Sequence, residues 1–132
     1  MKKLIVINGT MGVGKSALCE RLYKSLENSV WLDGDWCWLM HPWMFSEENI
    51  LMVEENITIL LGNYLKNTGI QYIVFSWVLH DDAILSGLLA KLKRLAVYKK
   101  TETVKIDTTD YTIDTAAEEI VSRLTSLNCD RL

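Results

Sequence analysis

The stretch from Gly9 to Ser16 constrains the fold more than any other part of the chain. It fits G-x-x-x-x-G-K-[ST], the Walker A pattern of a phosphate-binding loop. Glycines let the main chain turn tightly, so that its N–H groups point at phosphate oxygens. Lys15 supplies a cation for the outer phosphates, and Ser16 supplies a hydroxyl for Mg2+. The predicted loop residues are Gly9, Thr10, Met11, Gly12, Val13, Gly14, Lys15 and Ser16.

The flanking sequence supports this interpretation. Residues 3–7 form a continuous apolar run rich in β-branched side chains, which is typical of a strand buried on both faces. Residues 17–26 repeat apolar side chains at helical spacing. A glycine-rich turn without a ligand is the alternative, and the order of strand, loop and helix argues against it. A dinucleotide fingerprint is disfavoured because no glycine stands three residues after Gly14.

The rest of the chain alternates between short apolar runs typical of strands and apolar residues repeating at helical spacing. This alternation predicts an α/β fold with a mostly parallel sheet covered by helices on both faces. Ligands of such sheets bind at the carboxyl ends of the strands, where the loop, residues 33–35, 77–80 and 108–109 all fall. The predicted strands are 3–8, 29–32, 70–79 and 103–107, and the predicted helices are 14–27, 47–66, about 82–98 and a last one opening at Thr112 or Asp114.

The length, net charge and composition of the chain limit its number of domains and its possible partners. The 132 residues suffice for one domain with one core. A net charge of −3 gives no reason to expect a nucleic-acid partner. The three cysteines lack metal-ligand spacing and are typical of reduced thiols in the cytoplasm. The N-terminal apolar run is too short to span a membrane, so we expect a cytoplasmic protein without a membrane partner.

Three segments together resemble a known group, the P-loop nucleoside and nucleotide kinase-like phosphotransferases. This group includes nucleoside monophosphate kinases, shikimate kinase, chloramphenicol phosphotransferase and tunicamycin-resistance proteins. The resemblance lies in Asn8–Ser16, Leu32–Asp35 and Lys105–Thr109. It implies a three-layer P-loop NTPase fold, ATP as donor, Mg2+ as cofactor, and a small acceptor such as a nucleoside, a nucleotide, another hydroxylated metabolite or an antibiotic.

The resemblance also implies roles for individual residues. A carboxylate after the second strand contacts the acceptor hydroxyl or the metal in the group, and this maps onto Asp33 and Asp35. Asp35 is the preferred base and Asp33 the preferred metal ligand, although the order could be reversed. The alternative is an acidic turn stabilised by its own backbone. Thr108 and Thr109 map onto the loop that borders adenine.

Aromatic residues near these positions are candidates for an acceptor pocket. Their flat faces could lie against a base or another apolar group, and the candidates are Trp36, Trp38, Trp43, Trp77 and Phe45. Trp36 and Trp38 are favoured because they flank the acidic turn. Core packing is the alternative for each of them. His80 is predicted to orient the acceptor or the phosphate, or else only to precede a helix.

The chain departs from the group where a further strand and an arginine-bearing lid are expected. Residues 81–100 instead predict a single helix, in which Arg94 is the only arginine. Arg94 is therefore the candidate clamp for the transferred phosphate, and a homodimer partner that supplies an arginine is the alternative. We also consider a segment missing between about Leu88 and Leu92. One unbroken helix over residues 84–98 would contradict this hypothesis, and two helices meeting there would support it.

Three functions compete on this sequence. The first is an ATP-dependent small-molecule kinase, and the second is a nucleotide-binding or regulatory module with decayed kinase activity. The third, a GTPase or motor ATPase, is disfavoured because the sequence contains no Asn-Lys-x-Asp motif. Its third strand also continues as Ser76-Trp77 instead of ending in the usual aspartate.

Overall fold

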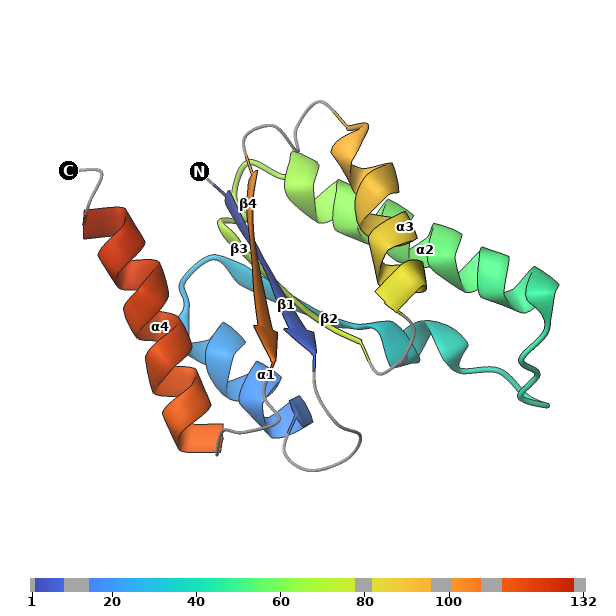
Figure 1. Cartoon of the computed structure of the whole chain (residues 1–132), viewed down its shortest axis with the longest axis horizontal. Coiled ribbons are helices and arrows are strands. Elements are labelled where there is room, and N and C mark those ends of the chain that lie inside the picture. The colour runs from blue at the N-terminus through green and yellow to red at the C-terminus, as the bar shows by residue number, and fades with distance from the viewer. Residues whose placement is uncertain (1, 9–14, 78–81, 96–100, 108–112, 130–132) are drawn as a thin grey trace.

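The computed structural model describes residues 2–8, 15–77, 82–95, 101–107 and 113–129. Strands and helices alternate along these residues, as Figure 1 shows. The elements are β1 (Lys2–Asn8), α1 (Lys15–Ser25), β2 (Ser29–Asp33), the 3-10 helix η1 (Gly34–Trp38), α2 (Glu47–Lys66), β3 (Tyr72–Ser76), α3 (Asp82–Lys93), β4 (Thr101–Asp107) and α4 (Ile113–Cys129).

The sheet has helices on both of its faces. Within the described residues it contains four strands in the order β2-β3-β1-β4, and all paired strands are parallel. Helices α1 and α4 cover one face, and α2 and α3 cover the other (Figure 1). The predicted three-layer α/β fold is therefore confirmed.

Strand β1 explains why its sequence is continuously apolar. Leu4 and Val6 belong to the core cluster under α2 and α3, whereas Ile5 and Ile7 belong to the cluster under α1 and α4. Successive side chains of a strand point to opposite faces, and both faces are buried here. The buried Lys3 extends to α4, where its Nζ donates to the carbonyl oxygen of Leu124 at 3.2 Å.

Two local signals for chain reversal and helix initiation are confirmed. Asn28 ends the turn after α1 with a φ of 59°, in the left-handed region that asparagine tolerates. Ser46 caps α2, and its side chain accepts a hydrogen bond from the N–H of Asn49.

Strand lengths differ from the prediction because neighbouring strands set them. The third strand is Tyr72–Ser76 and not 70–79, since its pairing with β2 and with β1 stops at Ser76. The last strand begins at Thr101, two residues before the predicted start, because Thr101 pairs with Lys2 at the beginning of β1.

Helix α3 crosses the region where a missing segment was considered. It continues without interruption through residues 88–92 and ends at Lys93. Arg94 and Leu95 follow in a turn, in which their N–H groups donate to the carbonyls of Lys91 and Leu92. Residues 96–100 lie outside the described part, so the continuous helix to residue 98 is not seen. The missing segment therefore stays a hypothesis.

Candidate active site

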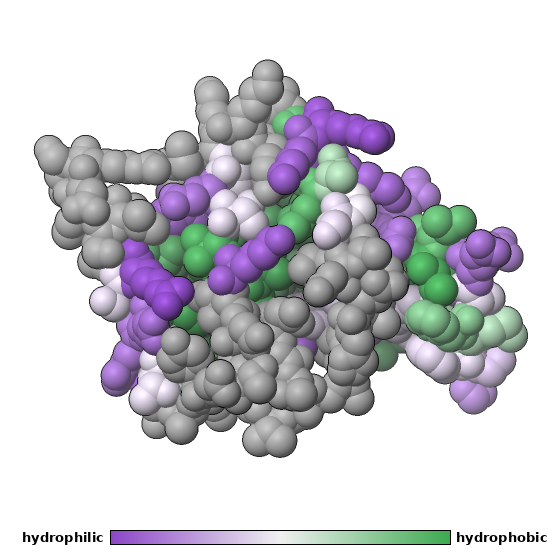
Figure 2. Space-filling view, viewed as in Figure 1, coloured by the Kyte–Doolittle hydropathy of each residue, from purple (hydrophilic) through white to green (hydrophobic). Residues whose placement is uncertain are grey.

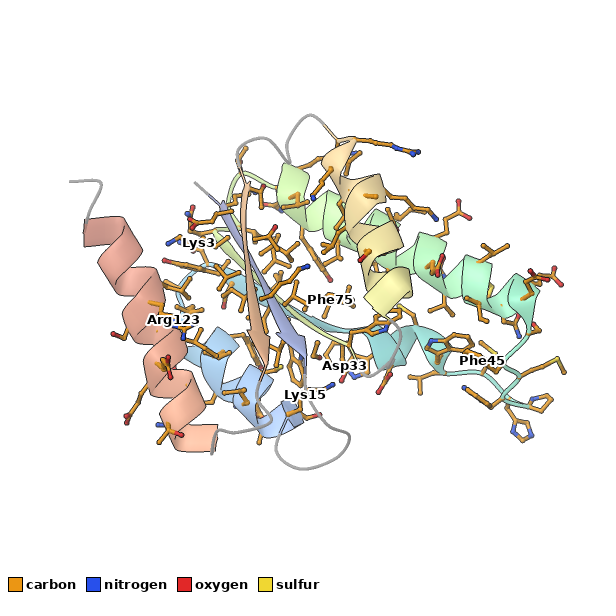
Figure 3. The ribbon with its side chains drawn as sticks, in the orientation of Figure 1. Lys3, Lys15, Asp33, Phe45, Phe75 and Arg123 are labelled. Carbon is orange, nitrogen blue, oxygen red and sulfur yellow. The ribbon has the colours of Figure 1, made fainter. Side chains whose placement is uncertain are left out.

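Three chain segments meet at the carboxyl ends of the parallel strands. Lys15 is the first residue of α1, Asp33 is the last residue of β2, and Trp77 follows β3 directly. Figure 3 shows Lys15 and Asp33 close together below the strand ends. The Nζ of Lys15 donates to the main-chain oxygen of Trp77 at 2.8 Å, and the Lys15 residue is only 8% exposed. The predicted phosphate lysine thus lies at the predicted edge of the sheet.

The surroundings of Lys15 act on its charge in opposite directions. Burial lowers the pKa of Lys15, because it removes water from the ammonium group. The charges of Asp33, Asp35 and Cys19 raise it again. Lys15 is therefore a partly desolvated cation that faces two carboxylates, and such a charge interacts strongly with a phosphate.

Asp33 holds the acidic turn together. One of its side-chain oxygens, Oδ1, accepts a hydrogen bond from the N–H of Asp35 at 2.9 Å and caps η1. This is the self-stabilised turn that the sequence offers as the alternative role of the pair. The bond uses Oδ1 alone, so a capping role and a role toward a metal are compatible. Asp33 is 8% exposed, whereas Asp35 is exposed.

The surroundings of Asp35 act on its charge in opposite directions. Burial and the neighbouring charge of Asp33 raise the pKa of Asp35, and Lys15 lowers it. A carboxylate with a raised pKa takes up a proton more readily than an ordinary one, so Asp35 stays the candidate base.

Replacing Asp33 with asparagine tests this coupling. Asparagine keeps an oxygen for the Asp35 N–H and removes the negative charge, so the pKa of Asp35 is expected to fall. Carbon-13 NMR titration of the carboxyl group measures the change, and Glu48→Gln on α2 is the control. An unchanged or higher pKa of Asp35 in the Asp33→Asn protein would contradict the interpretation.

The raised pKa of Asp35 also makes the free energy of unfolding depend on pH. A carboxyl group with a raised pKa in the folded state contributes stability that is fully present below its ordinary pKa. That contribution is lost as the pH rises through the raised value. The free energy of unfolding of the Asp33→Asn protein should therefore fall less as the pH rises through the raised pKa of Asp35.

Gly34 makes the contact between the acidic turn and Trp77. A Cβ atom added to Gly34 would lie 2.2 Å from Cε3 and 2.7 Å from Cζ3 of the Trp77 ring. Trp77 is itself only 4% exposed and packs against Phe75 with ring centroids 5.6 Å apart. The ring therefore lies directly against the main chain between Asp33 and Asp35, where only glycine fits.

The candidate tryptophans Trp77, Trp36 and Trp38 have different environments. Trp77 is buried, and Trp36 packs on Trp31 of β2 with ring centroids 4.9 Å apart. Trp38 is half-buried, and it follows Asp35 by three residues in η1. Side chains three residues apart eclipse in a 3-10 helix, so Asp35 and Trp38 share one side of η1.

Trp38 belongs to a group of three rings in mutual contact, which we call the aromatic shelf: Trp38, Trp43 and Phe45. Trp43 and Phe45 stack at an interplanar angle of 15° and are 61% and 50% exposed. Trp38 contacts both rings. Phe45 lies at the projecting end of the molecule in Figure 3, and Figure 2 shows apolar residues on the surface at that end. The shelf thus presents flat apolar faces beyond the acidic turn.

The structure does not bring Arg94 to these residues. Helix α3 starts beside the carboxyl edge and runs back along the sheet (Figure 1), and Arg94 follows its last residue. Twelve residues of α-helix span about 18 Å. The predicted catalytic role of Arg94 stays a prediction. Ser16 is exposed in the first turn of α1, and residues 9–14, His80, Thr108 and Thr109 lie outside the described part.

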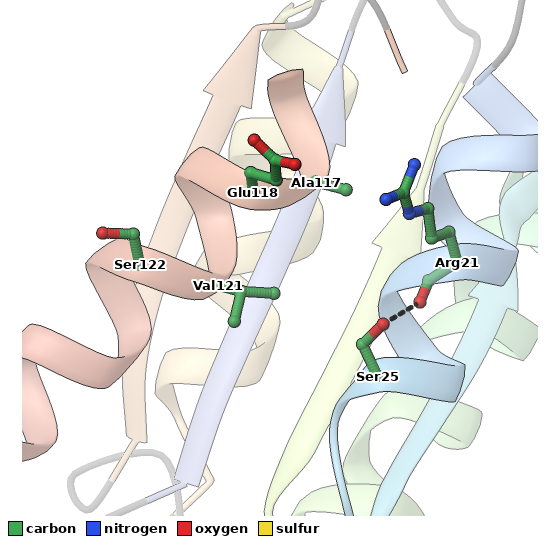
Figure 4. Close-up of a pocket in the computed structure, with 6 residues that line it drawn as sticks. All are labelled: Arg21, Ser25, Ala117, Glu118, Val121 and Ser122. Carbon is green, nitrogen blue, oxygen red and sulfur yellow. Dashed lines mark hydrogen bonds between the residues drawn. The ribbon is translucent and has the colours of Figure 1, made fainter. Parts of the chain in front are cut away.

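A groove elsewhere on the surface is separate from these residues. It has a volume of about 340 Å3 and lies between α1 and α4, as Figure 4 shows. None of the predicted site residues lines it. Its lining residues are Arg21, Ser25, Ala117, Glu118, Val121 and Ser122.

The carboxylates fit a magnesium ion that is shared with a nucleotide. Among the described residues no group of three or more metal-binding side chains occurs. Magnesium at nucleotide sites is held by one or two carboxylates together with phosphate oxygens, so such a group is not required. Asp33 and the hydroxyl of Ser16 are the candidate ligands.

Two features of the site were not predicted from the sequence. They are the Trp77 carbonyl that holds Lys15 and the contact of Gly34 with the Trp77 ring. A main-chain acceptor leaves no signal in a sequence. The glycine between two aspartates indicated a turn, and nothing local indicated a ring from another strand.

These features define the class of protein. The sheet, the loop sequence between β1 and α1, and the acidic turn after β2 are those of the P-loop phosphotransferase-like group. The chain belongs to the AAA_18 family, described as an AAA domain, which matches residues 5–128. No curated protein matches the sequence. No described helix is long and apolar enough to cross a bilayer.

Solved structures share the fold. The tunicamycin resistance protein of Deinococcus radiodurans is 16% identical with a TM-score of 0.61, and the match covers 94% of this chain and 96% of that one. A chain of the Pnkp1/Rnl/Hen1 complex is 20% identical with a TM-score of 0.54. There the match covers 92% of this chain but only 38% of the other, so this chain spans well under half of that protein.

Proposed function

We propose that this protein binds ATP with Mg2+ and transfers the γ-phosphate to a hydroxyl group of a small acceptor. The observation that carries the proposal is the position of Lys15. Its ammonium group is buried at the carboxyl edge of the sheet and interacts electrostatically with Asp33 and Asp35. Family membership supports a nucleotide-binding phosphotransferase at a general level.

The proposed step assigns a task to each residue. Asp35 takes the proton of the acceptor hydroxyl, whose oxygen forms a bond to the γ-phosphorus. The bond from that phosphorus to the bridging oxygen breaks, and its electron pair leaves with ADP. Lys15 offsets the charge on the outer phosphates. Ser16 and Asp33 would hold Mg2+, which neutralises phosphate charge when bound.

The aromatic shelf supports an acceptor with a flat apolar part. Trp38 lies on the same side of η1 as Asp35, and the exposed rings of Trp43 and Phe45 continue from it. Such faces bind a nucleobase or a comparable ring better than a bare sugar. The tunicamycin resistance protein is named for an antibiotic, so antibiotics belong in the acceptor panel.

Asp35→Asn is the variant that tests the base. Acceptor-dependent ADP production is expected to fall by about 100-fold or more, because asparagine cannot take the proton. Affinity for ATP with Mg2+ should change little. Isothermal titration calorimetry and an ADP assay measure the two quantities, and Glu47→Gln is the matched control. An equal loss of ATP affinity would instead place Asp35 at the metal.

A binding or regulatory module without transfer activity is the second candidate. The position of Arg94 favours it, because Arg94 follows the end of α3 that lies away from the carboxyl edge of the sheet, where the transferred phosphate would be. ADP production with and without a panel of nucleosides and hydroxylated metabolites separates the two functions. Tight ATP binding without acceptor-dependent turnover would support the module. A rate per protein molecule that rises with protein concentration would indicate an arginine from a second subunit.

A further inference from the structure

We propose that Trp77 is a positioning residue that transmits occupancy of the phosphate loop to the acidic turn. Trp77 contacts both halves of the site. Its main-chain oxygen holds Lys15, and its ring lies against Gly34. The inference rests on the proposed nucleotide binding and goes beyond it, because it couples the donor side of the site to the acceptor side.

The first contact, the hydrogen bond from Lys15 to the Trp77 carbonyl, is expected to break when phosphate binds. Lys15 donates to the neutral carbonyl of Trp77 at 2.8 Å. A phosphate oxygen carries negative charge and is a stronger acceptor for an ammonium group than a carbonyl is. Binding of a phosphate chain therefore draws Lys15 away from Trp77 and releases the main chain just after β3.

The second contact, between the Trp77 ring and Gly34, couples a movement of residue 77 to the acidic turn. The Trp77 ring leaves no room for a side chain at Gly34, so a shift of residue 77 moves the ring against or away from the turn. Packed interiors transmit such displacements because they contain few voids. The main-chain N–H of Asp35 donates to the Asp33 carboxylate, so the turn is expected to move as one unit.

The third observation concerns the indole nitrogen. Among the described residues, the buried Nε1–H of Trp77 has no hydrogen-bond partner. An unpaired buried donor is unfavourable and calls for an explanation. A ring held in this state loses no hydrogen bond when it shifts, and a shift that gives the donor a partner is favoured. The unpaired donor therefore does not oppose the proposed shift of the ring.

Fluorine NMR tests the coupling directly. The five tryptophans are labelled as 5-fluorotryptophan, and their resonances are assigned with single Trp→Phe variants. ADP with Mg2+ is the probe, and calorimetry measures its binding independently. The resonances of Trp77 and of Trp36, the neighbour of Asp35, are expected to shift with one midpoint. The resonance of the exposed Trp43 should stay in place.

The Trp77→Phe variant separates transmission from simple packing. Phenylalanine keeps the main-chain carbonyl and a buried ring but lacks the Cε3 and Cζ3 atoms nearest Gly34. ADP should still bind, and the Trp36 resonance should no longer shift. Tyr64→Phe on α2 is the control, in which the Trp36 shift is retained.

Several outcomes would overturn the inference. One is a Trp36 shift that persists in the Trp77→Phe protein, and another is no Trp36 shift in the wild type although calorimetry shows ADP binding. If Trp77→Phe does not fold, the wild-type titration still decides, because separate midpoints for Trp77 and Trp36 exclude the coupling. An absence of ADP binding in the wild type would refute the proposed function itself.

Discussion

Replacing Lys15 with alanine is expected to weaken binding of ATP with Mg2+ by roughly 100-fold or more. Lys15 is a buried cation, and the carboxylates of Asp33 and Asp35 raise its pKa against the effect of burial. Without it, those two carboxylates would face the phosphates with one compensating charge fewer. Calorimetric titration with ATP and Mg2+ measures the loss. Acceptor-dependent ADP production should disappear with it.

The fold should survive this substitution. Lys15 contributes one hydrogen bond, to the Trp77 carbonyl, and alanine is the best helix former at the start of α1. The free energy of unfolding is therefore expected to change by only about 1 kcal/mol. Lys24→Ala is the matched control, since Lys24 is an exposed lysine on the same helix that pairs with Glu20. Unchanged ATP affinity in the Lys15→Ala protein would refute the assigned site.

Replacing Gly34 with alanine is expected to lower the free energy of unfolding by about 3 kcal/mol. The added methyl group would lie 2.2 Å from Cε3 of Trp77. The ring has little freedom to move away, because it is 4% exposed and packs on Phe75 in the core. The main chain is the other partner in the clash, and the capping bond of Asp33 holds it.

Gly87→Ala is the matched control for this substitution. Gly87 lies in α3, and nothing stands within 4 Å of an added Cβ. Alanine there should raise the free energy of unfolding by up to about 1 kcal/mol, because glycine is a poor helix former. Urea denaturation measures both variants. Trp77→Phe should recover part of the loss in the Gly34→Ala background, and a Gly34→Ala protein as stable as the wild type would contradict the contact.

The sequence by itself determined the features that depend on neighbouring residues and periodicity. The apolar run of β1 predicted a strand buried on both faces, and the order of elements predicted the layers. Asn28 and Ser46 act as predicted because each works within a few residues of itself. The same local chemistry indicated the acidic turn of Asp33 and Asp35, which the structure places beside Lys15.

Only the tertiary structure decided what depends on residues far apart in the chain. Lys15 and the Trp77 carbonyl are 62 positions apart, and the need for glycine at position 34 comes from the ring of that same distant residue. The end of β3 follows from its neighbouring strands, and the position of Arg94 follows from the direction in which α3 runs. Periodicity specifies which face of an element is buried. It does not specify which atoms of another element lie against that face, because packing of the whole core selects them.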